Sequence, residues 1–416
     1  MPADQQGTDP LRPLAGTRVL DLTQVVAGPF CTMMLANLGA DVVKVEPPGR
    51  GDDLRYVGRY PGREQHEDYF NATNNSKRSL ILDLKDGRHR EAAHALAARA
   101  DILVENFAPG TAAKLGMGWA ELHALNPRLL YCSISGFGQT GPESQRPAMD
   151  PIIQAVTGIM SVTGHPDSGP TAVGAPLADV IAGMFGAYAI VGALHAVRRS
   201  GLGCHIDVSM QAAMMATLGP RMGGSLNAGI APQRIGNQNP MRAPSDVYRT
   251  RDGRHVFLMI HHDRAWAPFC RAFGCPQWID DPRYADNRLR CANRDALNTL
   301  LHERFATLDA ADIIGRLRAE RVPCSLVNDY VEAAADAQVV DRKLIWEVEH
   351  RDSGRIRVVG PPWLIDGVAP QVGAPPALDE HLADVLGDWL GWTPEQIERL
   401  RAPHVPARAR NAGPRD

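Results

Sequence analysis

One carboxylate stands alone in a long apolar stretch of this chain. Residues 174–194, GAPLADVIAGMFGAYAIVGAL, hold a single charged side chain, Asp179. An aspartate at a helix start accepts hydrogen bonds from first-turn amides, so helix capping alone would explain it. A carboxylate can also act as a covalent nucleophile, and the small residues at 174, 175 and 178 leave room beside it for a substrate carbonyl. The two roles are compatible, because capping amides and the helix dipole would keep Asp179 ionised.

Other reaction classes have no matching motif. The first expected strand-to-helix turn, TQVVAGPF, lacks the GxGxxG pattern, and there is no Walker A sequence, so neither a nicotinamide nor a nucleotide triphosphate site is predicted. His261 and His262 are adjacent rather than one helical turn apart, and HExxH is absent, so no metal site is predicted. Without a GxSxG elbow, a hydrolase triad has no anchor.

Composition limits the class of protein further. A chain of 416 residues is long enough for two or three domains, and its net charge of −3 makes nucleic acid and anionic membranes poor partners. Seven cysteines without a CxxC pair indicate reduced thiols. The opening MPADQQGTDPLRPLAG has no secretory pattern, so we expect a cytoplasmic protein. Residues 180–197 are uncharged but barely reach bilayer length, which favours a core helix over a membrane span.

The first 140 residues alternate between strand and helix periodicities. Strand-like runs at 17–23, 41–47, 78–84, 101–107 and 128–138 are separated by helical stretches, which predicts βαβ units and a parallel sheet. Ligands of such sheets bind beyond the carboxyl ends of the strands. That rule directs attention to the segments TQVVAGP, EPPGRGDDLR, ENFAPG and SGFGQTGP.

The segments after residue 140 predict two helices, followed by a β-hairpin and charge-rich helices. Asp150 is expected to cap one helix and Asp179 the next, in which Ala178, Ala182 and Gly186 form a small-residue stripe for close packing. Near residue 246, DVYRTRDGRHVFLMI predicts a β-hairpin turning at Asp252-Gly253. Charge-rich helical segments then run to about 320, which indicates a smaller α+β domain.

Several segments carry a family likeness. They are PLAGTRVLDLTQVVAGPFCTMMLANLGADVVKVEPPGRGD, NNSKRSLILDLK, DILVENFAPGTAAKLGMG, ISGFGQTGP, GAPLADVIAGMFGAYAIVGALHAVRRSGLGCHIDVSM, IGNQNP and APPALDEHLADVLGDWLGWTPEQI. With these segments in order and with similar spacing over residues 13–400, the chain resembles the class III CoA-transferase family, which includes formyl-CoA and carnitine CoA-transferases.

The resemblance implies an α/β fold with a large Rossmann-like domain made from both chain ends, 1–220 and 326–403. It implies a small α+β domain with linkers at 221–325 and a tail at 404–416. Two ring-shaped protomers are expected to interlock as a homodimer.

It also implies a CoA-transferase that moves CoA from an acyl-CoA thioester to a carboxylic acid. Asp179 would attack the acyl-CoA, forming an aspartyl anhydride and then an aspartyl-CoA thioester, with CoA as a substrate and no metal. The implied catalytic set is Asp179, Gln24, Gly236, Asn237 and Gln238. The implied CoA-contacting set is Val26, Ala27, Leu82, Lys85, Asn106, Phe107, Lys114 and Ser135. Lys85 and Lys114 are the natural phosphate partners, unless they are ordinary surface lysines.

The chain departs from formyl-CoA transferase at Pro47, at Val26, at Ser135–Phe137, and at the lid segment containing Gly236, Asn237 and Gln238. Formyl and oxalyl specificity is therefore not implied. The family also contains α-methylacyl-CoA racemases, which place a histidine where this chain has Met149. Because methionine cannot move protons, a racemase or isomerase is the second interpretation, and a CoA-binding protein without chemistry is the third.

The segments expected near Asp179 are polar, offering Gln24, Arg55, Ser135, His165 and Gln238. A long acyl chain would require a mostly apolar pocket, whereas a second carboxylate would require an arginine. We therefore expect small dicarboxylic acids, with Arg55 or Arg146 as the partner of the second carboxylate. IGNQNP is expected either to be a mobile lid or to be an ordinary polar loop.

Overall fold

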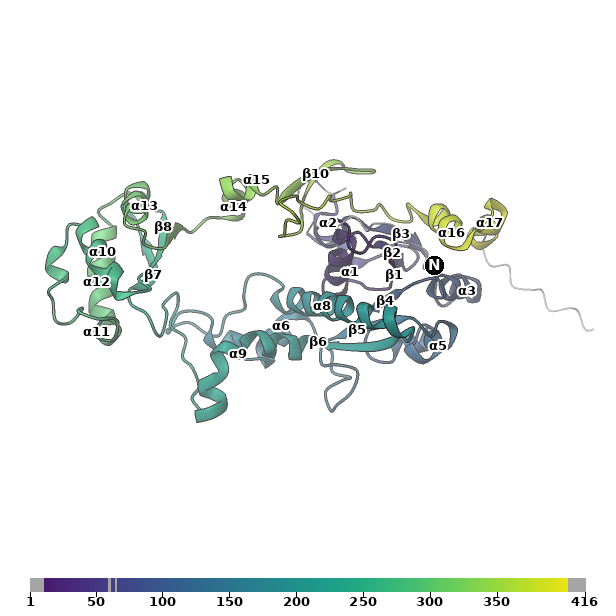
Figure 1. The fold of residues 1–416 in the computed structure, drawn as a ribbon, viewed down its shortest axis with the longest axis horizontal. Helices are drawn as coiled ribbons and strands as arrows, with labels where there is room; N and C mark the ends of the chain where they lie inside the picture. The colour runs from purple at the N-terminus through teal and green to yellow at the C-terminus, as the bar shows by residue number, and fades with distance from the viewer. Residues whose placement is uncertain (1–10, 59–60, 64–65, 403–416) are drawn as a thin grey trace, which may run out of the picture. The chain divides into compact units, whose positions relative to one another are not determined.

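The computed structural model describes residues 11–58, 61–63 and 66–402. The chain forms two compact units, drawn in Figure 1. The first contains Met1–Ile153, Pro176–Thr217 and Arg342–Asp416, and the second contains Gln154–Ala175 and Leu218–Asp341. Segment 154–175 thus groups with the second unit, and the return to the first unit comes at 342 rather than 326. The first ten residues and the expected tail at 404–416 lie outside the described residues.

A six-stranded parallel sheet forms the centre of the first unit. Its order, β3-β2-β1-β4-β5-β6, is the strand order of dinucleotide-binding Rossmann folds. The first five strands match the predicted runs, so the parallel α/β fold is confirmed; the sixth, the edge strand CHIDVS, was not predicted, although Cys204, Ile206 and Val208 alternate with polar residues in it. The strands are β1 Arg18–Asp21, β2 Asp41–Glu46, β3 Arg78–Ile81, β4 Ile102–Glu105, β5 Leu130–Ser135 and β6 Cys204–Ser209.

Helices cover both faces of this sheet (Figure 1). On one face lie α1 (Ala27–Asn37) and α8 (Leu177–Ser200). The opposite face shares a core with α3 (Gly87–Ala97), α5 (Trp119–Leu125), α16 (Leu382–Leu390) and α17 (Pro394–Arg401). The shorter elements of this unit are η1 Asp53–Tyr56, α2 Asp68–Asn74, α4 Thr111–Lys114 and the hairpin β10 Ile345–His350 with β11 Gly354–Val359.

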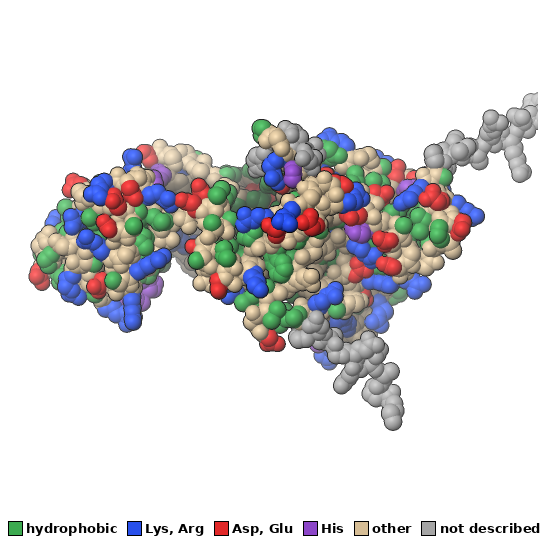
Figure 2. Space-filling model, turned by 90° about the horizontal axis from the view of Figure 1, so that it is seen from above, with side chains coloured by type: hydrophobic (Ala, Val, Ile, Leu, Met, Phe, Trp, Pro, Cys, Tyr) green, Lys and Arg blue, Asp and Glu red, His purple; other side chains and the backbone are tan. Residues whose placement is uncertain are grey.

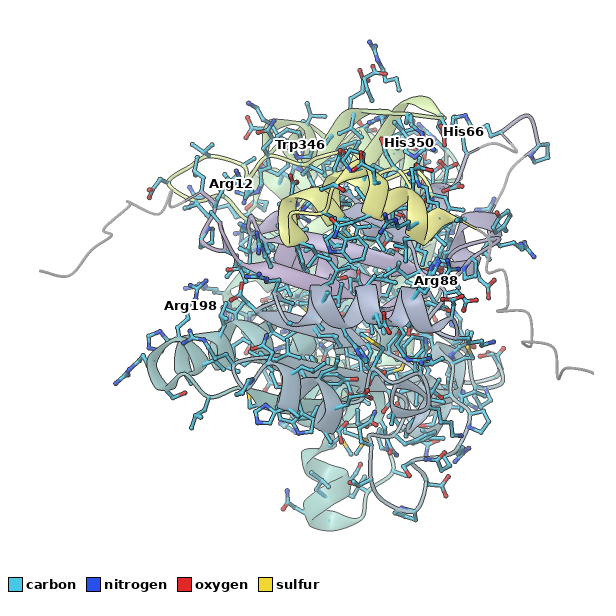
Figure 3. The ribbon with its side chains drawn as sticks, turned by 90° about the vertical axis from the view of Figure 1, so that its right-hand side faces the viewer. Arg12, His66, Arg88, Arg198, Trp346 and His350 are labelled. Atoms are coloured by element: carbon cyan, nitrogen blue, oxygen red, sulfur yellow. The ribbon has the colours of Figure 1, made fainter. Side chains whose placement is uncertain are left out.

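The C-terminal part of the chain packs against the N-terminal part. The Arg88 guanidinium, labelled in Figure 3, donates to the carbonyl oxygens of Arg399 and Ala402, each at 3.2 Å. The His89 ring also contacts the Leu400 carbonyl at 3.1 Å. These contacts join α3 to the end of α17, so both ends of the chain build one domain.

Close packing of α8 on α1 depends on small side chains. Ala178, Ala182 and Gly186 are buried, which confirms the predicted stripe. The tightest approach is at Gly183, where a Cβ atom would lie 2.6 Å from the Ala27 carbonyl oxygen. Because the obstacle is backbone rather than a flexible side chain, only glycine fits there.

The opposite face of α8 is apolar and exposed. Met184, Phe185, Tyr188 and Val191 lie on it, with Tyr188 79% exposed. Among the described residues, α8 is the one helix long and apolar enough to cross a membrane, and 44% of its most apolar window is buried. A core helix of a soluble protein passes the same test, so length and composition alone do not assign a membrane span.

The second unit contains an antiparallel sheet, β7-β8-β9, and its own core. The predicted hairpin is confirmed as β7 Ser245–Arg249 paired with β8 His255–Met259, and β9 is Cys324–Leu326. Its helices are η2 Asp263–Ala265, α10 Trp266–Ala272, η3 Pro276–Trp278, α11 Asn287–Ala292, α12 Arg294–Phe305, α13 Ala310–Ala319, α14 Tyr330–Ala334 and α15 Ala337–Asp341, with α7 at Ile159–Val162. Two helices cross from one unit into the other, α6 Asp150–Val156 and α9 Met210–Ala228.

Basic and acidic side chains are interspersed on the molecular face drawn in Figure 2. A face on which the two charges alternate offers no continuous basic surface for a phosphate backbone.

Replacing Gly183 by alanine should destabilise the first unit by about 1–3 kcal/mol, because overpacking forces the backbone of α1 or α8 to shift. Gly387→Ala, inside α16, is the matched control, since nothing lies within 4 Å of a Cβ atom there. It should stabilise the protein by about 0.5–1 kcal/mol through helix propensity. Urea unfolding followed by circular dichroism measures both, and equal effects would contradict the close-packing interpretation.

Candidate active site

Asp179 opens into a cavity of about 360 Å³ at the carboxyl ends of β1, β4 and β5. This is the position at which parallel α/β sheets bind ligands. Three segments flagged from the sequence contribute residues to its wall. The lining comprises Val25, Val26, Ala27, Asn106, Phe107, Ala108, Pro109, Ile134, Ser135, Gly136, Ser144, Gln145, Arg146, Pro147, Ala148, Met149, Asp150, Asp179 and Met210.

The start of α8 is capped by a different carboxylate from the one predicted. Pro176 occupies the N-cap position, and Asp179 lies in the first turn. The carboxylate of Asp150 accepts hydrogen bonds from the amides of Ala178 at 2.6 Å and Asp179 at 3.3 Å. The prediction that Asp179 caps this helix is therefore wrong, because Asp150 reaches across from α6 and takes the amides.

The pKa of the Asp179 carboxyl group is strongly shifted in this position. Burial, together with the nearby Asp150 carboxylate, raises the pKa of Asp179 from 3.8 to about 7. The expectation that capping amides would keep Asp179 ionised is thus also wrong. Near neutral pH the Asp179 carboxyl group is present in both its protonated and ionised forms, and the ionised form is poorly solvated.

The turn between β1 and α1 forms another wall of this cavity and is held in an unusual conformation. Val25 has a φ of 66°, a left-handed value that is rare for a β-branched residue. Its amide donates to both carboxylate oxygens of Asp52, each at 3.2 Å. The side chain of Asn106 donates to the Gln24 carbonyl at 2.7 Å and accepts from the Gln24 amide at 2.8 Å. Side chains from two other segments therefore fix this turn.

A buried cluster of charges lies beneath the turn. Lys44 pairs with Asp52, and Lys77 pairs with Asp21, each at 3.0 Å with both side chains fully buried. Lys44 also donates to the Thr23 carbonyl at 2.6 Å. Burial would lower the pKa of Lys44, but the surrounding carboxylates, Asp52 foremost, outweigh burial and raise it. The lysine stays charged and joins the turn to Asp52.

The structure brings most of the predicted CoA-contacting residues together. Val26, Ala27, Asn106, Phe107 and Ser135 share the cavity of Asp179. A neighbouring cavity of about 110 Å³ is lined by Gln24, Leu82, Lys85 and Phe107, among others. Phe107 lines both cavities.

Lys114 lies in neither of these two cavities. It is exposed at the end of α4, next to Leu115, which lines the smaller cavity. Asn106 uses its side-chain amide to hold Gln24. A hydrogen bond of Asn106 to CoA would therefore use its backbone, its second side-chain N–H or the remaining lone pair of its side-chain oxygen.

The residues of the expected lid belong to the second unit. Gly236 has a φ of 61°, and its amide donates to the Gly164 carbonyl at 2.9 Å. A Cβ atom at this position would lie 2.7 Å from the His165 ring, so the close approach requires glycine. Asn237 and Gln238 line a cavity of about 440 Å³ in this unit. Movement of this loop stays a prediction.

Of the two arginines expected to bind a substrate carboxylate, the structure excludes Arg55. Its guanidinium is 1% exposed and pairs with Glu46 at 2.6 Å and Glu67 at 2.5 Å, so the prediction for this residue is wrong. Arg146 is about half exposed, lies over the Phe137 ring at 5.2 Å and pairs with Glu143 at 3.3 Å. Among the described residues lining the cavity of Asp179, Arg146 is the only lysine or arginine.

Sequence reasoning missed the part played by Asp150, Asp52 and Lys44. A signal for the buried pair was present, since Lys44 lies between the apolar residues Val43 and Val45 in the middle of the strand DVVKVE. A charged residue on a buried parallel strand indicates a buried partner. Asp150 was read only as the cap of its own helix. Met149 does line the cavity beside Asp150, at a position where a racemase needs an acid or base.

The model of CoA-transferase family III matches residues 14–382 of this chain. The chain belongs to CoA-transferase family III. It is 40% identical over 375 residues to the acetyl-CoA:oxalate CoA-transferase of Acetobacter aceti, covering 89% of this chain and 94% of that enzyme. It is 36% identical over 397 residues to the succinate–glutarate CoA-transferase of Agrobacterium fabrum, covering 94% and 98%.

A solved CAIB/BAIF family protein from Brucella suis superposes on this CoA-transferase with a TM-score of 0.82 and 34% identity, covering 91% of this chain and 99% of that one. The family resemblance inferred from the sequence is thereby confirmed, and the enzyme is a family III CoA-transferase.

The buried pair beneath the turn can be tested by stability. Asp52→Asn should lower the free energy of unfolding by about 3–5 kcal/mol, because it leaves Lys44 as a buried cation without its nearest anion. The adjacent Asp53 is exposed, so Asp53→Asn should change stability by no more than about 0.5 kcal/mol. Urea unfolding at pH 7 measures both, and similar values for the two variants would refute the role assigned to Asp52.

The raised pKa of Asp179 predicts how stability depends on pH. The folded protein retains the Asp179 proton up to about pH 7, whereas an unfolded chain loses it near pH 3.8, so ionisation destabilises the fold across that window. Asp179→Asn should equal the wild type near pH 4. It should exceed the wild type above pH 7 by up to about 4 kcal/mol, the limit set by 1.36 kcal/mol per pKa unit.

Asp167→Asn, at an exposed carboxylate, should show no such divergence between pH 4 and 8. Thermal unfolding of the three proteins at several pH values measures the effect. An Asp179→Asn variant that parallels the wild type at every pH would contradict the raised pKa.

Proposed function

We propose that this family III CoA-transferase moves CoA between small dicarboxylic acids, with Asp179 as the covalent nucleophile. The observation that carries the proposal is the position of Asp179. Its carboxyl group opens, with a raised pKa, into a cavity at the ligand-binding edge of the sheet. The resemblance to the family assigns its catalytic aspartate to the same residue.

The reaction consists of four exchanges at carbonyl carbons. The Asp179 carboxylate attacks the thioester carbon of the donor, expels the CoA thiolate and forms a mixed anhydride. The thiolate then attacks the Asp179 carbonyl, releases the donor acid and leaves an aspartyl-CoA thioester. The acceptor carboxylate attacks that thioester, again expelling thiolate and giving a second anhydride. The thiolate finally attacks the acceptor carbonyl, which forms the new acyl-CoA and regenerates Asp179.

The cavities suggest how CoA is bound. Val26 and Ala27, at the start of α1, line the cavity of Asp179 and would meet the thiol end. Leu82 and Lys85 line the neighbouring cavity and would meet the nucleotide portion, with Lys85 and Lys114 contacting its phosphates. Phe107 lines both cavities, so a single CoA molecule that extends from one to the other would contact it. Gly236, Asn237 and Gln238 would cover the reacting group.

Two features support dicarboxylic acids as the substrates: the position of Arg146 and the similarity to other CoA-transferases. A cation on the wall of a cavity that already holds two carboxylates, Asp150 and Asp179, offers a binding point for a second substrate carboxylate. The names of the similar enzymes include oxalate, succinate and glutarate.

We further propose that the enzyme is an interlocked homodimer in the cytoplasm. The exposed apolar face of α8, which includes Phe185 and Tyr188, requires cover. A second copy is the proposed cover rather than a membrane.

The proposal is tested by offering succinyl-CoA or decanoyl-CoA with a set of mono- and dicarboxylic acids and reading the products by mass spectrometry. The wild type should form new acyl-CoA mainly from succinyl-CoA and a small dicarboxylic acid. Asp179→Ala should lose at least about 1,000-fold in turnover, because no other group replaces a covalent nucleophile. Hydroxylamine added during turnover should convert Asp179 to its hydroxamate.

Near wild-type transfer by the alanine variant would refute the mechanism. A preference for decanoyl-CoA would refute the substrate class. Exchange of the α-proton of a (2R)-methylacyl-CoA in heavy water would restore the racemase interpretation.

A further inference from the structure

Ser135 has a buried side-chain hydroxyl group that makes no hydrogen bond to the described residues. It is the last residue of β5 and is 7% exposed, and among the described residues its Oγ has no hydrogen-bond partner. The same residue lines the cavity of Asp179. Buried hydroxyl groups are nearly always paired in folded proteins, because an unpaired one loses its hydration without compensation. A polar group of a bound ligand is the partner that this position would accept.

Arg146 is held on the same wall of the cavity. Directly after Ser135, Gly136 is packed so closely that a Cβ atom there would lie 2.2 Å from the Cβ of Ala148. The end of β5 and the loop that carries Arg146 are therefore in contact, at a position where only glycine fits. The Arg146 guanidinium lies 5.2 Å from the centre of the Phe137 ring, which restricts its orientation.

The charges of the cavity indicate where a substrate anion would be placed. Asp150 and Asp179 repel a carboxylate, and Arg146 is the only described lysine or arginine in the lining. A second carboxylate on the acyl group is thus attracted away from the reacting end and toward Arg146. The hydroxyl of Ser135 donates one hydrogen bond and the guanidinium donates several, so together they can satisfy both oxygens of a carboxylate.

We propose that Ser135 and Arg146 form the subsite that binds the second carboxylate of a dicarboxylic acyl group during CoA transfer. The inference rests on the proposed function, since it specifies how that function selects its substrate. It makes Ser135 a specificity-determining residue rather than a contact of the CoA moiety.

The test compares two donors of equal chain length. Succinyl-CoA carries a carboxylate where butyryl-CoA carries a methyl group, and both are assayed with a common acceptor. Ser135→Ala should lower kcat/KM for succinyl-CoA roughly 10- to 100-fold, the range for one hydrogen bond to a charged group. For butyryl-CoA it should leave kcat/KM within about two-fold, or raise it, because no carboxylate is bound.

Arg146→Gln should show the same selectivity. The double variant should lose less than the product of the two single losses, because both residues bind one group. Ser200→Ala and Arg199→Gln replace exposed residues at the end of α8 and serve as matched controls, with kcat/KM unchanged for both donors. Ser135→Ala should have an unchanged or higher Tm than the wild type, since the hydroxyl it removes has no partner.

Equal losses on both donors would overturn the inference and place Ser135 at the reacting carbonyl or in the CoA site. Losses that simply multiply in the double variant would overturn the shared subsite. Failure of the proposed function gives a different result: a wild type that transfers CoA from butyryl-CoA as well as from succinyl-CoA, or from neither. A wild type that prefers succinyl-CoA, with Ser135→Ala keeping that preference, refutes this inference alone.

Discussion

The active-site geometry depends on a buried pair of opposite charges, Lys44 and Asp52. Both are fully enclosed, and between them they bind two points of the β1–α1 turn, the Thr23 carbonyl and the Val25 amide. A β-branched residue adopts a left-handed φ only where its surroundings enforce it. The charged pair supplies that constraint here, and the turn then presents the start of α1 to the cavity. The wall that faces Asp179 is thus stabilised by charges that do not themselves line the cavity.

Two aspartates lie at the start of α8, and only one of them, Asp150, caps the helix. Asp150 accepts the amide hydrogen bonds of α8 and is stabilised by them. Asp179 is buried and lies near the Asp150 carboxylate, and these two features raise its pKa. A carboxylate that capped the helix would be more stable as an anion and a weaker nucleophile. In the proposed mechanism, the separation of capping from chemistry favours attack of Asp179 on a thioester.

The regular part of the fold could be predicted because hydrophobic periodicity reports local structure. Five strands and the β7–β8 hairpin were found in this way, whereas the edge strand β6 was not assigned; its alternation spans only six residues, of which Val208 alone is buried. Asp179 was recognisable because a lone charge in an apolar run is rare. Its role as a cap was misassigned because the competing carboxylate, Asp150, lies 29 residues away, and sequence cannot show which one reaches the amides.

Arg55 illustrates the same limit. Its segment follows a strand of the sheet, which suggested a cation near Asp179 that could bind a substrate carboxylate, yet Glu46 and Glu67 pair with its side chain. Both partners are acidic residues whose spacing carries no signal. What remains is an asymmetric cavity, with two carboxylates at the reacting end and one arginine on the wall beside β5. Under the proposed function, such a gradient of charge would orient a dicarboxylic acyl group by repulsion at one end and attraction at the other. Selectivity for the second carboxylate would then require no change at the proposed nucleophile, so substrate choice could vary through residues such as Ser135 while the chemistry is kept.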